Sequence, residues 1–168
     1  MHTPHCFESF FSAGFECSTQ RRPDGRRLDL LAATGHDVHA AEDYLRIRRH
    51  GLRTARDGVR WHRVETAPGQ YDWSSFLPML RAARGAGVQA IWDLCHYGWP
   101  DGLDIWSAAF VERFARFAGA LAAVVRAESE RPAWYCPVNE ISYWAWAGGD
   151  QARFHPGARG RGDELKRQ

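Results

Sequence analysis

The stretch Ala133-Trp134-Tyr135-Cys136-Pro137-Val138, followed directly by Asn139-Glu140, decides how the rest of this chain is interpreted. Its short apolar, aromatic-rich composition predicts a strand that ends at Asn139. An aromatic segment, residues 141–146, comes next. A carboxyl group at a strand end beside indole rings is suited to general acid catalysis, and the neighbouring amide can donate a hydrogen bond to a substrate hydroxyl. Taken alone, Glu140 is more simply interpreted as a surface side chain that faces solvent. The rest of the sequence has to decide between that interpretation and a catalytic acid.

Strand-like and helix-like segments alternate along the 168 residues. Strands are predicted over 10–16, 54–60, 88–95 and 133–139, helices over 38–50, 73–86 and 107–129, and the start of another helix over 162–168. Such alternation is typical of parallel strands joined by right-handed crossover helices. We therefore expect a single α/β domain over residues 1–168, with strands paired in chain order and 107–129 as the longest helix.

Polar and aromatic side chains gather where each predicted strand ends. They are Glu16 at the end of the first strand, 60–65 at the end of the second, 93–100 at the end of the third and Asn139-Glu140 at the end of the fourth. In parallel α/β folds, the C-terminal ends of the strands carry the active site. The four ends are thus predicted to form one mouth, although polar loops are also ordinary features of such folds.

Four short segments carry a resemblance to a known family. They are Gly58-Val59-Arg60-Trp61, Cys95-His96-Tyr97-Gly98-Trp99-Pro100, Val138-Asn139-Glu140 and Phe154-His155-Pro156-Gly157. In combination they resemble the N-terminal half of a clan A glycoside hydrolase, nearest to the family 1 β-glucosidases. The resemblance extends from about Phe10 to Gly160. It implies a partial TIM barrel, that is, a (β/α)4 half-barrel with parallel strands, and hydrolysis of a β-glycoside with retention.

The resemblance also implies roles for individual residues. Glu140 matches the acid/base, Asn139 the residue that binds the sugar 2-hydroxyl, and His96 a residue that contacts the glycone. Arg60 matches the arginine that pairs with the nucleophile, and its alternative role is an interior ion pair with Asp57 or Asp93. The indole rings of Trp99, Trp144 and Trp146 are candidate sugar platforms, or else packing residues.

The sequence departs from the family pattern in places. Ile141 stands where the family has proline, Pro137 interrupts the fourth strand, and Gln20 matches the strand-one glutamine only loosely. A complete barrel takes about 250 residues, and the family nucleophile comes from strand seven. We therefore expect an N-terminal fragment that carries the acid/base but lacks the nucleophile and is inactive alone. Glu16 and Asp93 are the alternatives for a second carboxyl group.

Composition limits the other possibilities. The net charge is only +2, and no apolar run is long enough to span a membrane, so neither nucleic acid nor membrane is an expected partner. The four cysteines lack metal-binding spacing, so no cofactor or metal is expected, and Cys17, Cys95 and Cys136, in or at the end of predicted strands, are expected to be buried thiols in a reducing cytoplasm. Three alternatives remain open. They are a half-barrel that self-associates, a carbohydrate-binding module without turnover, and a barrel enzyme with a metal on His62 and His96.

Overall fold

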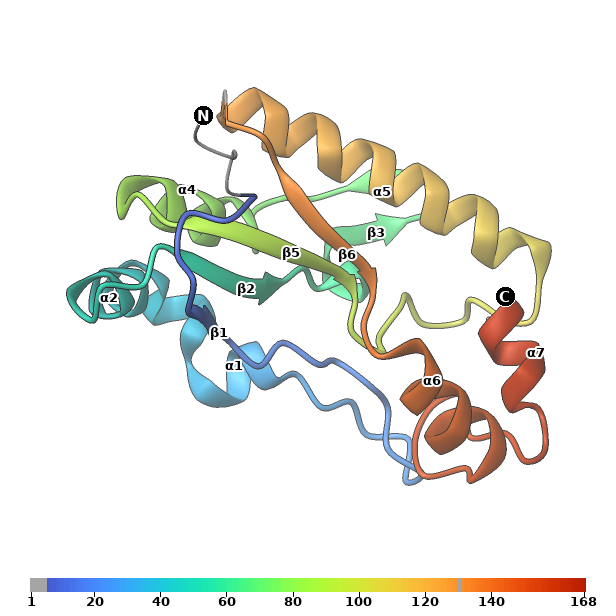
Figure 1. The fold of residues 1–168 in the computed structure, drawn as a ribbon. Coiled ribbons are helices and arrows are strands. Elements are labelled where there is room, and N and C mark those ends of the chain that lie inside the picture. The colour runs from blue at the N-terminus through green and yellow to red at the C-terminus, as the bar shows by residue number, and fades with distance from the viewer. Residues whose placement is uncertain (1–5, 130) are drawn as a thin grey trace.

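A four-stranded parallel sheet forms the centre of the molecule in the computed structural model, which describes residues 6–129 and 131–168 (Figure 1). Residues 1–5 and 130, which the predicted domain includes, lie outside the described residues. The strands are β1 (Ser12–Gly14), β2 (Thr54–Gly58), β5 (Gln89–Cys95) and β6 (Trp134–Val138). Their order is β1-β2-β5-β6, as the chain order predicts. The predicted α/β class with a partial barrel of four parallel strands is confirmed.

The strand register brings the C-terminal strand ends to one edge of the sheet. Asp93 on β5 pairs with Gly58 on one side and with Cys136 on the other. One residue beyond the strand, the backbone N–H of Asn139 still donates to the Cys95 carbonyl oxygen. Pro137 has no N–H to donate, and the register accordingly passes from Cys136 to Val138 without it.

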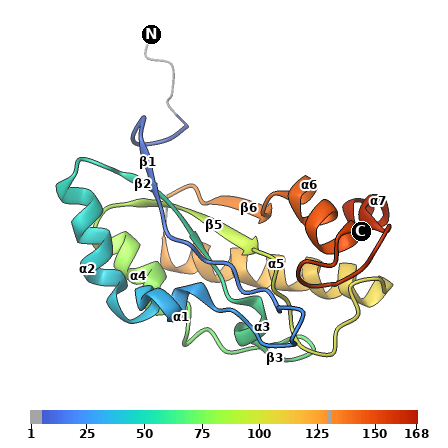
Figure 2. The same ribbon diagram turned by 90° about the horizontal axis from the view of Figure 1, so that it is seen from below.

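Three helices cover one face of the sheet (Figure 2). They are α2 (His36–Arg49), α4 (Leu77–Gly85) and α5 (Ala108–Glu128). Apolar residues recur along α5 at helical spacing, and the side chains of Phe110, Phe117, Leu121 and Val125 are buried against the sheet layer. As predicted from this spacing, α5 is the longest of the described helices.

Several short elements lie in the segments between the predicted strands and helices. Helix α1 (Leu30–Thr34) begins where the Asp29 carboxylate accepts a hydrogen bond from the Ala32 amide. Helix α3 (Trp61–Val64) and the hairpin of β3 (Glu65–Ala67) with β4 (Gln70–Tyr71) follow β2. Because β2 ends at Gly58 and α3 follows almost at once, residue 60 is not part of the strand.

A helical segment adjoins the C-terminal strand ends. It comprises α6 (Ile141–Trp144), the π-helix η1 (Ala145–Asp150) and α7 (Gly162–Arg167). The Asp150 carboxylate accepts a hydrogen bond from the Gly162 amide at 2.6 Å, which ties η1 to the start of α7. Among the described helices, none combines the length and apolar character that crossing a membrane requires.

Candidate active site

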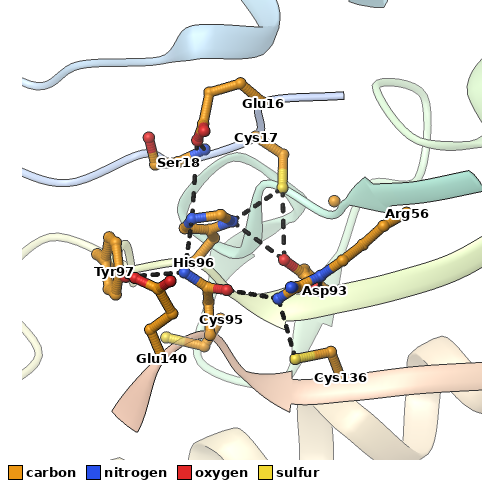
Figure 3. Close-up of polar contacts among 12 residues, drawn as sticks. Glu16, Cys17, Ser18, Arg56, Asp93, Cys95, His96, Tyr97, Cys136 and Glu140 are labelled. Carbon is orange, nitrogen blue, oxygen red and sulfur yellow. Dashed lines mark hydrogen bonds and ion pairs between the residues drawn. The ribbon is translucent and has the colours of Figure 1, made fainter. Parts of the chain in front are cut away.

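The C-terminal strand ends bring a set of polar side chains together on the sheet face opposite the helices. Successive side chains of β2 point to opposite faces of the sheet, which decides which of them belong to this set. The Asp57 carboxylate faces α2, where it contacts His36 and Tyr44, so the side chain of Arg56 must leave the other face. Figure 3 shows the resulting cluster, which we call the mouth cluster. Its members are Glu16, Cys17, Arg56, Asp93, His96, Tyr97, Cys136, Asn139 and Glu140.

Arg56 fixes the orientation of the Asn139 amide. Its guanidinium donates from Nη2 to Asn139 Oδ1 at 2.5 Å and from Nε to Asp93 Oδ1 at 2.6 Å. A guanidinium has no acceptor atom, so the oxygen of Asn139 has to face it. The Nδ2 group of Asn139 therefore points away from Arg56.

The two N–H hydrogens of Asn139 Nδ2 are both used within the chain. Nδ2 lies 2.9 Å from His96 Nε2 and 2.8 Å from the Tyr97 hydroxyl oxygen. That hydroxyl in turn lies 3.0 Å from Glu140 Oε2. Tyr97 accepts from Asn139, so its own hydrogen is free to be donated to Glu140. The structure thus brings His96, Asn139 and Glu140 together, with Tyr97 joining the last two.

His96 connects this cluster to β1. Because Nε2 accepts from Asn139, the ring hydrogen lies on Nδ1, which is 3.0 Å from Asp93 Oδ2 and 3.1 Å from Cys17 Sγ. Burial alone would raise the pKa of Asp93, but hydrogen bonds from His96 and Arg56 hold it below its usual value. Burial and the charge of Asp93 raise the pKa of the Cys17 thiol far above its usual value, so this thiol stays protonated.

Cys17, Asp93 and His96 also have the composition of a metal site, since one ligand atom of each lies within 4.8 Å of the others. The hydrogen-bond pattern opposes that interpretation. With Asn139 oriented by Arg56, the Nδ1 atom that would bind the ion carries the ring hydrogen instead. His62 does not belong to this group, and its pKa is lowered to about 4 by burial and by the charge of Arg27.

Two residues of the mouth cluster have left-handed backbone conformations that residues other than glycine seldom adopt. Tyr97 has φ 66° and Glu140 has φ 40°. Such conformations persist only where surrounding contacts hold them, and they concentrate at functional sites. Here the two strained residues hydrogen-bond to each other. The Glu140 side chain reaches solvent, whereas Tyr97 is buried.

Arg60 lies outside the mouth cluster, contrary to the predicted convergence. Its buried guanidinium pairs with Asp37 at 2.6 Å and with Asp29 at 3.3 Å. The predicted alternative, a pair with Asp57 or Asp93, is wrong as well. Because β2 ends at Gly58, the chain turns into α3 before residue 60, and the strand alternation that would aim Arg60 at the mouth is lost. The guanidinium that reaches Asn139 is that of Arg56.

Two of the three candidate sugar platforms are packed inside the protein. Trp99 is 2% exposed, stacks on His155 at 4.1 Å and donates its Nε1 hydrogen to the Leu103 carbonyl oxygen. Trp144 is 5% exposed and donates to the His155 carbonyl oxygen. Only Trp146, at 41% exposed, offers a ring to solvent, with the Arg153 guanidinium 4.4 Å above it.

Arg56 and Tyr97 are mouth-cluster residues that the sequence prediction missed as site residues. An arginine inside a predicted strand, one position from Asp57 and four from Arg60, could have been found only with the correct strand end. Tyr97 lies between His96 and Gly98, and a hydroxyl group beside a candidate site residue was a sequence signal that could have identified it. Its left-handed backbone, which turns the ring toward Glu140, has no sequence signal comparable to glycine.

Comparison with solved structures finds the same fold in β-glucosidases. A Trichoderma harzianum β-glucosidase aligns with 93% of this chain at a TM-score of 0.72 and 14% identity. A rice β-glucosidase aligns with 88% at 0.68 and 16% identity, and a family 1 β-glucosidase from Thermotoga maritima with 74% at 0.64 and 18% identity. No protein-family model matches the sequence, and no curated protein matches it.

These likenesses confirm the predicted resemblance in fold. The chain has the fold of part of a family 1 β-glucosidase barrel. It spans 36% of the rice chain, 29% of the Thermotoga chain and 39% of the Trichoderma chain.

Proposed function

We propose that this chain supplies the acid/base half of a retaining β-glycoside hydrolase site. Glu140 is the acid/base, and His96 and Asn139 bind the sugar, whose hydroxyl groups would replace the present bond between Asn139 Nδ2 and His96 Nε2. The observation that supports it most is that Glu140, Asn139 and His96 belong to one hydrogen-bonded group at the C-terminal strand ends, in which Glu140 is exposed, His96 is partly buried and Asn139 is buried. The rice enzyme, which shares the fold, was captured in a covalent complex with glucose, as a retaining mechanism requires.

A second carboxylate has to come from outside these four strands. Retaining hydrolysis needs two carboxyl groups about 5–5.5 Å apart. Asp93 is 1% exposed and engaged by Arg56 and His96, so it cannot attack a sugar. Glu16 is exposed, but it accepts from the Ser18 amide and lies on another side of the His96 ring from Glu140 (Figure 3). We therefore expect no turnover of aryl β-glucosides by the chain alone.

A carbohydrate β-glycoside is the substrate, and no nucleic acid or cofactor takes part. All four cysteines, at positions 6, 17, 95 and 136, lie in the described residues and are free thiols, which supports a reducing cytoplasm. The whole chain would act as one partial barrel domain.

A sugar-directed alkylating reagent tests the role of Glu140 without needing turnover. The chain would be treated with N-bromoacetyl-β-D-glucosylamine in a Cys6→Ser background, because the exposed Cys6 thiol reacts with bromoacetyl groups. We expect peptide mass spectrometry to find the label on Glu140, with excess glucose slowing its attachment. Glu140→Gln should abolish the label, and Glu16→Gln should leave it unchanged. Labelling no faster than with bromoacetamide, or turnover that survives Glu140→Gln, would refute the proposal.

A further inference from the structure

The path of hydrogen bonds to Glu140 has a fixed direction. It begins at the Arg56 guanidinium, which can only donate, and passes through Asn139 to the Tyr97 hydroxyl. Because Asn139 Oδ1 accepts from Arg56, Asn139 Nδ2 donates to the Tyr97 hydroxyl oxygen, and that hydroxyl then has its own hydrogen to donate. The last hydrogen, that of Tyr97, therefore points at Glu140 Oε2, 3.0 Å away.

Tyr97 is built to hold this position. Its ring is 6% exposed and packs against Phe154 at 5.2 Å, Trp144 at 5.9 Å and His96 at 4.9 Å. Its left-handed backbone directs this buried ring toward the equally strained Glu140. Burial and the nearby Glu140 carboxylate raise the pKa of Tyr97 well above its usual value, so the hydroxyl keeps its hydrogen.

We propose that Tyr97 is the positioning residue of Glu140: its hydroxyl occupies Oε2, so that Oε1 is the oxygen that exchanges a proton with the substrate. This inference rests on the proposed role of Glu140 as the acid/base. In the acid step, the proton leaves Oε1 for the glycosidic oxygen as the bond between that oxygen and the anomeric carbon breaks. The second carboxylate, which comes from outside these four strands, forms the new bond to that carbon, and Glu140 becomes a carboxylate. Tyr97 keeps its own hydrogen and stabilises that carboxylate by the bond to Oε2.

The first test measures the hydrogen bond itself and does not depend on any glycosidase function. The chain would be labelled with ¹³C at the ζ-carbon of its five tyrosines. The Tyr97 signal is the one that Tyr97→Phe removes, or the one that survives each of the four other Tyr→Phe changes. We expect Glu140→Gln to shift this signal, because a charged acceptor is replaced by a neutral one, and Glu16→Gln to leave it unmoved. An unshifted Tyr97 signal in Glu140→Gln would overturn the inference.

The second test asks whether the bond positions Glu140 for a sugar. Tyr97→Phe removes one oxygen and keeps the ring packing. We expect it to lower the rate of Glu140 alkylation by the bromoacetyl glucosylamine about tenfold relative to bromoacetamide, as loss of a hydrogen bond to a charged group would. The matched control is Tyr143→Phe, whose exposed ring neighbours Tyr97 at 6.1 Å and which should change neither rate.

The outcomes separate the inference from the proposed function. Equal labelling of Tyr97→Phe and the unmodified chain would overturn the positioning role while leaving Glu140 as the acid/base. Absence of sugar-directed labelling in the unmodified chain would refute the proposed function and with it the role of Tyr97 in it. Loss of fold in Tyr97→Phe is excluded separately, by showing that the variant keeps the cooperative urea unfolding of the unmodified chain.

Discussion

Asp93 is the residue on which the mouth cluster depends most. It is 1% exposed and receives hydrogen bonds from Arg56 at 2.6 Å and from His96 at 3.0 Å. A buried carboxylate is costly unless such partners compensate for the lost water. The partners do more than compensate, because the net effect on the pKa of Asp93 is to lower it.

Replacing Asp93 with Asn should therefore destabilise the fold. We expect a loss of about 2 kcal/mol in the free energy of unfolding at pH 7, measured with urea, since Arg56 loses its charged partner. A carboxyl group with a lowered pKa stabilises the fold above its ordinary pKa of 3.8, and that contribution disappears as the pH falls below it. The difference between the two proteins should thus shrink below about pH 4. As a control, Asn at the exposed Asp101, which pairs with Arg21 and Arg27, should cost less than about 1 kcal/mol.

At the scale of single residues, the sequence predicted which residues stand at the strand ends but not the direction in which each side chain points. The sequence predicted that His96, Asn139 and Glu140 would lie together, because each stands just after a strand end and the register of parallel strands brings such positions to one edge. Arg60 was misassigned because β2 stops two residues before it, so the strand alternation that would aim its side chain at the mouth no longer applies. The burial of Trp99 and Trp144 depends on the loop around His155, whose course the sequence pattern does not reveal.

At the scale of elements, the loops that follow β1 and β5 lie in backbone contact. The Thr19 amide donates to the His96 carbonyl oxygen, and a Cβ atom added at Gly98 would overlap Thr19. Replacing Gly98 with Ala should force the loops apart and cost about 1–3 kcal/mol in urea unfolding. Gly119 on α5 is the matched control, because nothing lies within 4 Å of an added Cβ there. Ala at that exposed helical position should instead stabilise by up to about 1 kcal/mol. Equal effects at the two glycines would contradict the close approach.

The contact of α2 with β2 is predicted to depend on pH. His36 lies between two carboxylates, with Nδ1 2.9 Å from Asp43 and Nε2 3.1 Å from Asp57. Burial alone would lower the pKa of His36, but these hydrogen bonds and charges raise it above 6.5. A raised histidine pKa gives stability that is complete below pH 6.5 and is lost as the pH rises through the folded-state pKa.

Urea unfolding between pH 6 and pH 9 would measure this effect. The unfolding free energy of the unmodified chain should fall over that range, and the fall should be smaller in His36→Gln. His39, which is exposed on the same helix, provides the control, and His39→Gln should keep the full dependence. A flat profile for the unmodified chain would mean that His36 is uncharged between the two carboxylates.

Elements with strong periodicity were predictable to within a few residues, as α5 shows. The short ones were not. Helix η1 carries two glycines, Gly148 and Gly149, whose use becomes clear only in three dimensions, where they let His155 and Gly162 approach. Helix α1 has only five residues, between the N-cap Asp29 and the left-handed C-cap Gly35, and is too short to show a helical period.

For the whole molecule, the open barrel has the largest consequence. Strands β1 and β6 are both edge strands, and the sheet face that carries the mouth cluster has no helix layer over it among the described elements (Figure 2). Beside β1, Phe10 is 94% exposed and Phe11 is 73% exposed. Unpaired strand edges next to exposed aromatic rings favour pairing with another chain.

We therefore expect the purified chain to self-associate, with sedimentation equilibrium giving an average mass that rises with concentration above the 19.1 kDa monomer. Replacing Phe10 and Phe11 together with Ser should weaken the association, since it removes the apolar surface that a second chain would cover. Val38→Ser is the control, because Val38 is 78% exposed but lies on helix α2 and not on a strand. It should leave the association unchanged. A chain that stays monomeric at high concentration would show that the open edges are protected by their own shortness, since β1 has only three residues with which to pair.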